Sequence, residues 1–407
     1  MRRFTFLSSL TLAVLVLGAC SGTEESVATT AAPTSLVTTT TAVQATTSTK
    51  LTTTTAPILS VMVTGDVDPE LDAALGDLYS YWLDPRNPTP DAPAGLTAFL
   101  ATLPAPAADI TYTSTVRTLG DGGDTIAVIH VDETVWFGLK VDGSWRIVGG
   151  QPAGQVPWLG DSPRLVLVLG SDARVGQNQL RFRADSIHVI GLVPEQQTGA
   201  ILGIPRDTYV TTSEGDFKFT NLMAGRGPEI MLETATDLTG LPLEGYIVTG
   251  FKGYTALLTQ LGGLSINLPT SMRSGNNWSN FPAGQQQLNP TRALQLARIR
   301  KGLPGGDFAR SLNQGRIMQA AMDMIQPMGI DSLPLMVDLL LQNAWTDLTT
   351  EDLLTLAAAA YLTPSQALVN QVVPGTVGRA GSASVVFLDP EAADIFADLA
   401  DGTLGNS

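Results

Sequence analysis

Four short apolar runs beyond residue 160 constrain the fold of this chain more than any other feature. The runs are residues 165–169, 187–193, 200–204 and 246–249. Continuous apolar runs of this length are typical of strands that are buried on both faces. Segments with the apolar spacing of helices alternate with them, at residues 229–238, 254–261, 291–296 and 307–325. This alternation predicts an α/β layered domain with a mainly parallel or mixed sheet.

The preceding residues, 58–156, predict a small α+β domain. Residues 69–83 have helical apolar spacing, and residues 110–119, 125–131, 135–141 and 145–148 resemble strands. Asp121-Gly122-Gly123 and Asp142-Gly143 supply turn residues between those strands. No catalytic constellation occurs here. His130 stands alone and is better interpreted as a packed or surface histidine than as a metal ligand.

The N-terminus has the layout of a bacterial lipoprotein signal peptide. Arg2 and Arg3 precede an apolar run at residues 4–17, which is shorter than the roughly 20 residues that a membrane-spanning helix needs. The run ends in Leu17-Gly18-Ala19-Cys20, which resembles a lipobox. Cys20 is the only cysteine of the chain, so no intramolecular disulfide can form. We therefore expect an exported protein, anchored to the outer face of the cell membrane by two acyl chains through Cys20.

Residues 21–57 form a Thr/Ser-rich stretch with few apolar residues, which predicts a disordered tether. No later segment is apolar enough over a sufficient length to cross a bilayer. The formal net charge is −15, and the basic residues form no block or stripe. This distribution argues against nucleic acid as a partner. Any phosphate must therefore be bound by a few individually placed arginines.

Charged clusters stand at the ends of the predicted strands. Gly170-Ser171-Asp172-Ala173-Arg174 follows the first strand, Arg183-Ala184-Asp185 precedes the second, and Pro205-Arg206-Asp207 ends the third. Ligands of open α/β sheets bind where the loops at strand ends converge. A convergence of Asp and Arg side chains there would suit a divalent cation together with an anionic ligand.

A further cluster is centred on the predicted helix 307–325. The alternation of an extended segment would place Arg298 and Arg300 on one side of the chain. Asp307 is expected to cap the helix, and Arg310 and Gln314 would share a helix face with it. A helix N-terminus is itself favourable for anions. Single Arg–Asp pairs often only tie loops together, but four such clusters in an acidic chain favour a functional site.

In this order and spacing, the clusters resemble the LytR-CpsA-Psr family over residues 164–400. The motifs are Gly-x-Asp-x-Arg at 170–174, Arg-x-Asp at 183–185, Pro-Arg-Asp at 205–207, Leu-Gly-Gly at 261–263, and Arg-x-Arg with Gly-Asp-x-x-Arg and Gln at 298–314. Thr346-Asp347-Leu348-Thr349 and Val373-Pro374-Gly375 also fit. The chain departs from the family at Asn221 and at Gly225-Arg226-Gly227, and in having Cys20 where the family has a transmembrane anchor.

The resemblance implies an α-β-α layered domain with a mixed central sheet and an apolar pocket for a polyprenyl chain. It implies a transferase that moves a phosphoglycan from a polyprenyl pyrophosphate carrier to a peptidoglycan hydroxyl, forming a phosphodiester. By position, Asp172 and Asp185 would bind Mg²⁺, or Mn²⁺, since both ions suit oxygen ligands. The pyrophosphate would be held by Arg206, Arg298, Arg300, Arg310, Gln314 and Lys218, with Asp307 in the same site.

The chemistry of these residue types agrees with that role. A pyrophosphate repels an incoming hydroxyl until its charge is neutralised, which a metal and arginines achieve. Polyprenyl phosphate would then be the leaving group, with Arg206 and Arg300 among the catalytic residues. The general base stays open between Asp307 and Asp172. His188 is better interpreted as a structural strand position.

Two other functions compete with the transferase. The same site would act as a pyrophosphatase if water replaced the acceptor. Alternatively, the protein would bind polyprenyl-linked glycans without any chemistry. The presence of both Asp172 and Asp185 favours catalysis, because a binding module could dispense with one of these carboxylates.

Overall fold

The computed structural model describes residues 59–65, 68–174, 176–274 and 279–405. These residues belong to one unit, residues 57–407. The predicted signal peptide, the predicted lipidation site Cys20 and the predicted tether to residue 57 lie outside the described residues.

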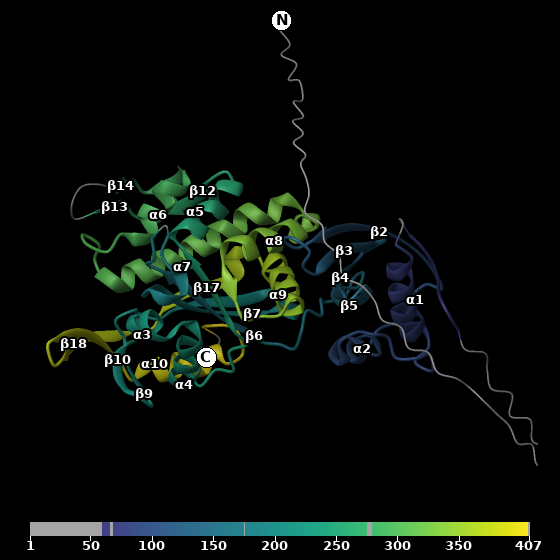
Figure 1. Ribbon diagram of the computed structural model, residues 1–407, viewed down its shortest axis with the longest axis horizontal. Helices are drawn as coiled ribbons and strands as arrows, with labels where there is room; N and C mark the ends of the chain where they lie inside the picture. Colours follow the sequence, from purple (N-terminus) through teal and green to yellow (C-terminus); the bar gives the residue numbers. More distant parts are fainter. Residues whose placement is uncertain (1–58, 66–67, 175, 275–278, 406–407) are drawn as a thin grey trace, which may run out of the picture. The chain divides into compact units, whose positions relative to one another are not determined.

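The N-terminal part is a five-stranded sheet with two helices on one face (Figure 1). Its strands, in spatial order, are β1 (Met62–Thr64), β2 (Asp109–Thr118), β3 (Thr125–Val131), β4 (Thr134–Val141) and β5 (Ser144–Gln151). The helices α1 (Pro69–Leu83) and α2 (Ala94–Leu100) bury Leu71, Leu75 and Leu96 against it. Asp142 and Gly143 turn between β4 and β5 with φ of 52° and 85°, the conformation that a two-residue hairpin requires. The predicted α+β elements are confirmed.

A six-stranded mixed sheet forms the centre of the C-terminal part. In spatial order it contains β16 (Trp345–Thr346), β11 (Tyr246–Gly250), β6 (Arg164–Ser171), β7 (Ala184–Val193), β8 (Thr198–Gly203) and β17 (Leu368–Val372). β7 is antiparallel to both β6 and β8, whereas β11 is parallel to β6 and β17 is parallel to β8.

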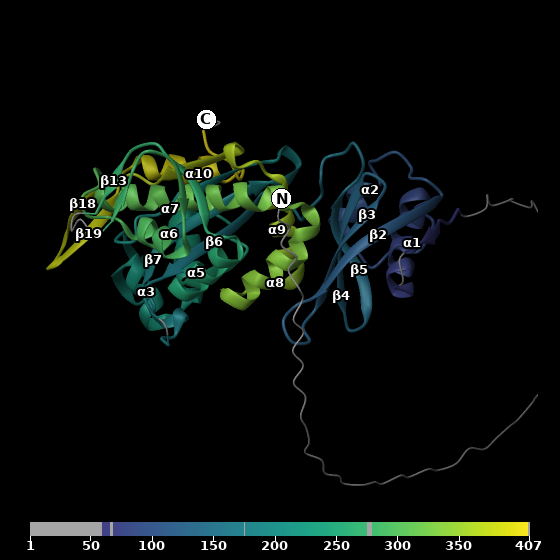
Figure 2. The same cartoon turned by 90° about the horizontal axis from the view of Figure 1, so that it is seen from above.

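Helices cover both faces of this sheet (Figures 1 and 2). The first face packs against α3 (Phe219–Arg226), α4 (Pro228–Thr239) and α10 (Glu391–Leu399); the second packs against α7 (Gly306–Ile325), α8 (Leu333–Asn343) and α9 (Thr350–Leu362). Leu165, Leu167 and Leu169 of β6 face the first layer, whereas Val166 faces the second. The predicted α-β-α fold with a mixed sheet is thus confirmed, and the continuous apolar runs reflect strands with two buried faces.

Smaller elements surround the layers. They are the strand pairs β9 (Tyr209–Thr212) with β10 (Gly215–Lys218), β12 (Leu264–Leu268) with β15 (Gly284–Leu288), β13 (Met272–Arg273) with β14 (Asn280–Phe281) and β18 (Gly375–Ala380) with β19 (Ala383–Leu388), and the helices α5 (Phe251–Gln260) and α6 (Pro290–Arg298). In both views the β18–β19 hairpin projects from the body of the C-terminal part.

The N-terminal sheet shares a hydrophobic core with α8 and α9. Val128, Phe137 and Val148 of the sheet belong to the same buried cluster as Val337 of α8 and Leu354 of α9. Polar contacts reinforce this junction. They include Arg117 Nε with Asp338 Oδ2 at 2.7 Å, the N–H of Gly120 with Asp338 Oδ1 at 2.9 Å and Arg146 Nη1 with Glu351 Oε2 at 3.1 Å.

Within the described ranges, no single helix has the length and apolar character needed to cross a membrane. One bent pair, Gly306–Met328 with Ile330–Asn343, meets the requirement by length and composition only.

Candidate active site

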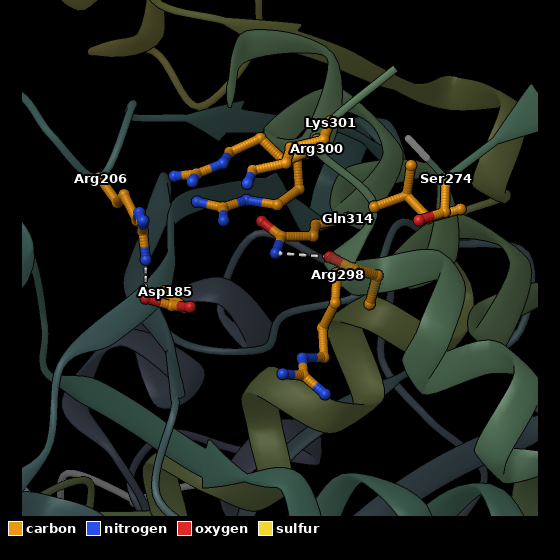
Figure 3. A pocket seen from close by; sticks show the side chains of 10 residues that line it. Asp185, Arg206, Ser274, Arg298, Arg300, Lys301 and Gln314 are labelled. Atoms are coloured by element: carbon orange, nitrogen blue, oxygen red, sulfur yellow. Dashed lines mark hydrogen bonds and ion pairs between the residues drawn. The ribbon is translucent and has the colours of Figure 1, made fainter. Parts of the chain in front are cut away.

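Three of the predicted charged clusters meet at a cavity of about 240 Å³, which we call the arginine cavity. Its side chains come from the start of β7, the loop after β8, the end of α6 and the loop that follows it, and the first turns of α7 (Figure 3). The lining residues are Asp185, Arg206, Ser274, Ala297, Arg298, Ile299, Arg300, Lys301, Arg310 and Gln314. The fold therefore brings together the four predicted arginines and Gln314.

Arg206 is surrounded by carboxylates. Its guanidinium hydrogen-bonds to Asp185, and its Nε lies 3.8 Å from Asp207 Oδ1 and 3.9 Å from Asp307 Oδ1. Burial works to lower the pKa of Arg206, but the three carboxylates outweigh it and raise the pKa. The Nε is buried, and no group in the described ranges accepts a hydrogen bond from it. Arg206 therefore stays charged, and its Nε–H can donate to an anionic ligand.

Arg310 is more deeply buried, with 6% of its surface exposed. Its Nη2 lies 2.7 Å from Asp307 Oδ1, which partly neutralises it. Burial lowers the pKa of Arg310, and the positive charges of Arg206 and Arg300 add to this effect. A buried guanidinium among other cations is stabilised by an anion, so the cavity favours a multiply charged ligand such as a pyrophosphate.

The prediction that Arg298 and Arg300 project from the same side is wrong. α6 continues to Arg298, so the alternation of an extended chain cannot begin before Ile299. The guanidinium of Arg298 points away from Arg300 in Figure 3 and lies over the ring of Phe251, 4.6 Å from its centroid. Arg300 and Lys301 point toward Arg206 instead.

The prediction that Asp307 caps α7 is also wrong. Gly305 and Gly306 adopt φ of 87° and 53°, and the helix begins at Gly306, so Asp307 is already inside the first turn. Its carboxylate pairs with Arg310, three residues further along the helix. Gln314, one turn beyond Arg310, donates from Nε2 to the carbonyl of Ala297 at 3.1 Å and holds α7 against the end of α6.

Asp172 lines a second cavity of about 540 Å³, which we call the carboxylate cavity. Its lining residues are Asp172, Arg174, Gln177, Arg181, Phe182, Arg183, Asp185, Ala224, Phe251 and Arg298. It shares Asp185 and Arg298 with the arginine cavity, so the two lie side by side. A β-bulge between Gly170 and Ser171 ends the regular pairing of β6 with β7, and Asp172 then accepts hydrogen bonds from the Arg183 N–H at 3.0 Å and from its Nη2 at 2.8 Å.

The two predicted metal ligands line this one cavity. Among the described residues, no group of three or more His, Cys, Asp and Glu side chains gathers. Two carboxylates nevertheless fit Mg²⁺ at a phosphate site, because this ion usually takes one or two carboxylates and completes its shell with phosphate oxygens and water. Asp172 and Asp185 would be those ligands.

Lys218 lies outside the cavities described above. Its Nζ is 3.6 Å from Asp207 Oδ1, and Asp207 in turn lies beside Arg206. Lys218 therefore lies beside Asp207, a neighbour of Arg206, and does not line the arginine cavity.

Comparison with known proteins identifies the family of this chain. The model of the LytR_cpsA_psr family matches residues 147–399, which is more than half of the chain. This chain belongs to that family. The resemblance inferred from the motifs is therefore confirmed.

Relatives in the family are similar over part of their length. The polyisoprenyl-teichoic acid–peptidoglycan teichoic acid transferase TagU of Bacillus mycoides is 32% identical over 161 residues, 39% of this chain and 51% of that protein. The cell wall biosynthesis protein LcpA of Corynebacterium glutamicum is 25% identical over 263 residues, 54% of this chain and 49% of that protein. The chain thus spans about half the length of these curated relatives. The solved structure of protein gbs0355 from Streptococcus agalactiae covers 60% of this chain and 90% of its own, with 17% identity and a TM-score of 0.52, and shows the fold alone.

An apolar cavity of about 310 Å³, as expected from membership of the LytR_cpsA_psr family, lies between α5, α7, α8 and α9. Its walls include Leu257, Leu261, Met318, Met322, Leu340 and Tyr361. Its lining is almost wholly apolar, unlike that of the two charged cavities. A hydrocarbon chain is the natural occupant of such a space.

Helix α7 connects the charged and apolar cavities. Arg310 and Gln314 line the arginine cavity, and Ile317, Met318 and Ala321 line the apolar cavity. These residues are spaced three or four apart, so they follow one face of the helix. At 1.5 Å per residue, the 15 steps from Arg310 to the last lining residue, Ile325, span about 22 Å.

Buried His188 fixes α7 to the sheet. It is fully buried on β7, and its Nε2 lies 3.1 Å from the carbonyl oxygen of Ser311. Burial lowers the pKa of His188 to about 4, so the imidazole is neutral at physiological pH and donates its Nε2–H to that carbonyl. The prediction of a structural position is confirmed.

Lys301, Phe251 and Ser274 are site residues that the sequence analysis missed. Lys301 directly follows Arg300, and that adjacency was an available signal. Phe251 begins α5 and meets Arg298 only through the tertiary fold, so its role leaves no local pattern.

Proposed function

We propose that this protein transfers a phosphoglycan from a polyprenyl pyrophosphate carrier to a hydroxyl of peptidoglycan and forms a phosphodiester. The observation that carries the proposal is the single face of α7 that leads from Arg310 and Gln314 into the apolar cavity. A ligand that follows this face must have a multiply charged head and a long hydrocarbon tail. Polyprenyl pyrophosphate has both.

The charged head is held by the arginine cavity in this scheme. Arg310 is buried and Arg206 is half-buried among charges, and Arg300 and Lys301 complete the positive lining. Arginine binds phosphate oxygens bidentately and keeps its proton at working pH. Preorganised cations lower the barrier because they stabilise the charge that moves to the leaving oxygen.

The chemical step exchanges one phosphorus–oxygen bond for another. The acceptor oxygen attacks the phosphorus that carries the glycan, and the bond to the bridging oxygen of the pyrophosphate breaks. Polyprenyl phosphate leaves with that electron pair, and the hydroxyl proton passes to a carboxylate. We assign the base to Asp307, because Asp172 is proposed to bind Mg²⁺ and already accepts hydrogen bonds from the backbone and side chain of Arg183, whereas Oδ2 of Asp307 has no partner among the described residues.

A divalent cation and a lipid anchor complete the proposal. Mg²⁺ bound by Asp172 and Asp185 would neutralise phosphate charge. Cys20 in its lipobox would hold the protein at the outer face of the cell membrane, where the polyprenyl carrier resides. The names of TagU from Bacillus mycoides and LcpA from Corynebacterium glutamicum, a teichoic acid transferase and a cell wall biosynthesis protein, support the same substrate class.

The test is turnover of a synthetic polyprenyl-pyrophosphoryl glycan by the purified full-length protein in detergent. The reaction is run with and without peptidoglycan and with and without Mg²⁺, beside Asp185→Ala and Arg300→Ala. Lys252→Ala is the matched control, since Lys252 is an exposed cation that lines none of these cavities.

Acceptor-dependent transfer that is lost in Asp185→Ala and Arg300→Ala and retained in Lys252→Ala is the expected result. Free sugar phosphate, formed equally with and without peptidoglycan, would instead identify a pyrophosphatase. Tight donor binding without turnover would leave a binding protein.

A further inference from the structure

A separate cavity lies between the projecting hairpin and the start of α7. We call it the hairpin cavity; its volume is about 440 Å³, within the roughly 300–1,000 Å³ of small-molecule sites. Val377 and Val385 of β18 and β19 form one wall. Asp207 and the start of α7, with Asp307 and Phe308, form the other.

The hairpin is fixed to the segment that carries Arg206. The N–H of Val386 donates to the carbonyl of Asp207 at 2.8 Å, and the ring of Phe387 lies 5.5 Å from that of Tyr209. The hairpin cavity is therefore held beside the arginine cavity by the backbone itself.

The lining of the hairpin cavity differs in charge from that of the neighbouring cavities. Its charged lining residues are the carboxylates Asp207 and Asp307, and the remaining walls are mostly apolar. The carboxylate cavity, by contrast, is lined by Arg174, Arg181 and Arg183. A phosphoglycan therefore finds cationic partners in the carboxylate cavity, whereas no described cation lines the hairpin cavity. An uncharged saccharide suits the hairpin cavity, because its C–H faces pack on apolar walls and its hydroxyls donate to carboxylates.

Asp307 stands between the two cavities. It lines the hairpin cavity, yet its Oδ1 is 2.7 Å from Arg310 and 3.9 Å from Arg206, both of which line the arginine cavity. Both of its oxygens are buried; Oδ1 is paired with Arg310, whereas Oδ2 has no partner among the described residues. A hydroxyl presented from the hairpin cavity would meet this carboxylate next to the pyrophosphate.

We infer that the hairpin cavity is the acceptor subsite and takes an uncharged saccharide unit of the peptidoglycan strand, with the reacting hydroxyl directed at Asp307. This inference rests on the proposed function and adds the place and chemistry of its acceptor. The donor glycan then lies in the carboxylate cavity and the acceptor lies in the hairpin cavity. Donor and acceptor therefore approach the phosphorus from different cavities.

The test measures acceptor and donor separately. The acceptor is a soluble peptidoglycan tetrasaccharide without stem peptides, whose lactyl carboxyl groups are capped as methylamides so that it carries no charge. Ser384→Trp fills the hairpin cavity from an exposed position, and Val377→Ser, at a side chain that is 65% exposed, removes part of its apolar wall. Val369→Ser is the matched control, because Val369 is an exposed valine on a strand and lines none of these cavities.

We expect Ser384→Trp to raise the KM for the tetrasaccharide by at least roughly tenfold, with a smaller rise for Val377→Ser. The Kd of the donor, measured without acceptor, should stay within about twofold of wild type. Val369→Ser should change neither quantity. An acceptor KM equal to wild type in both hairpin variants would overturn the inference.

Failure of the proposed function gives a different result. If the wild-type protein does not transfer at all, equilibrium binding of the tetrasaccharide decides the matter. Binding by wild type that Ser384→Trp abolishes supports the saccharide subsite without the transferase. Absent binding, or binding that both hairpin variants retain, overturns the subsite.

Discussion

His188→Gln removes a titratable side chain that holds helix α7, with Arg310 and Gln314, against the central sheet. The imidazole is fully buried, and its pKa is lowered from 6.5 to about 4 in the folded protein. In the unfolded chain this histidine titrates near 6.5. Between these values the unfolded chain binds a proton that the folded protein excludes, so the free energy of unfolding falls as the pH is lowered.

The size of the effect follows from the shift. At about 1.4 kcal/mol per pKa unit, the difference amounts to about 3 kcal/mol. The stabilising contribution is complete above the unfolded pKa, is lost progressively from about pH 6.5 to pH 4, and stays lost at lower pH. Glutamine preserves an N–H donor for the carbonyl of Ser311 but does not titrate.

Urea denaturation followed by the fluorescence of the 6 tryptophans measures this effect at a series of pH values. The stability difference between wild type and His188→Gln should shrink by about 3 kcal/mol from pH 7.5 to pH 4. His130→Gln is the matched control, since the chain has 2 histidines and His130 is partly exposed beside Asp331, with its Nε2 2.9 Å from Oδ1. The His130→Gln variant keeps His188, so its free energy of unfolding should still include the pH-dependent contribution of His188. A constant stability difference for His188→Gln across this range would refute a neutral, buried histidine.

Three further predictions concern the cavities and the junction between the two sheets. Ala321→Trp should place a ring in the apolar cavity and weaken binding of a long-chain donor by at least roughly tenfold, with little effect on a donor of two prenyl units; equal losses in a binding titration would contradict this. Arg300→Lys keeps the charge and loses the planar fork, so kcat/KM for transfer should fall roughly tenfold or more, and unchanged kinetics would show that bidentate binding is unimportant there. Arg117→Ala should lower the free energy of unfolding by about 1–3 kcal/mol, because it leaves the buried carboxylate of Asp338 with fewer donors; wild-type stability in urea would show that water replaces the guanidinium.

The sequence predicts the elements well where local periodicity and burial agree. The expected helix 69–83 and strand 125–131 match α1 and β3, and the apolar run 165–169 lies within β6. The apolar spacing of these segments predicts them correctly, because the same apolar residues form the core of the folded protein. The composition of the arginine cavity was also predictable, since Arg206 and Arg310 stand at the ends of such elements.

Predictions failed where the position of a side chain or cavity depends on the exact end of a helix or on contacts between residues distant in the sequence. Arg298 and Arg300 diverge because α6 runs to Arg298, and Asp307 misses the cap because Gly306 already starts the helix. Boundaries of this kind shift by one or two residues at small energetic cost. The apolar cavity could not be located from local pattern, because its walls come from four helices whose apolar residues have the same spacing as ordinary core positions.

The shared core between the N-terminal sheet and helix α9 gives this sheet a mechanical role. Leu354 and Ala358 of α9 lie in the buried cluster that includes the N-terminal strands, whereas Ala357 and Tyr361 of the same helix line the apolar cavity. A fragment that begins at residue 157 would expose part of this shared apolar surface to water, next to the side of α9 that lines the apolar cavity. The N-terminal sheet therefore supports a helix that lines the apolar cavity, and its removal would loosen that wall of the cavity.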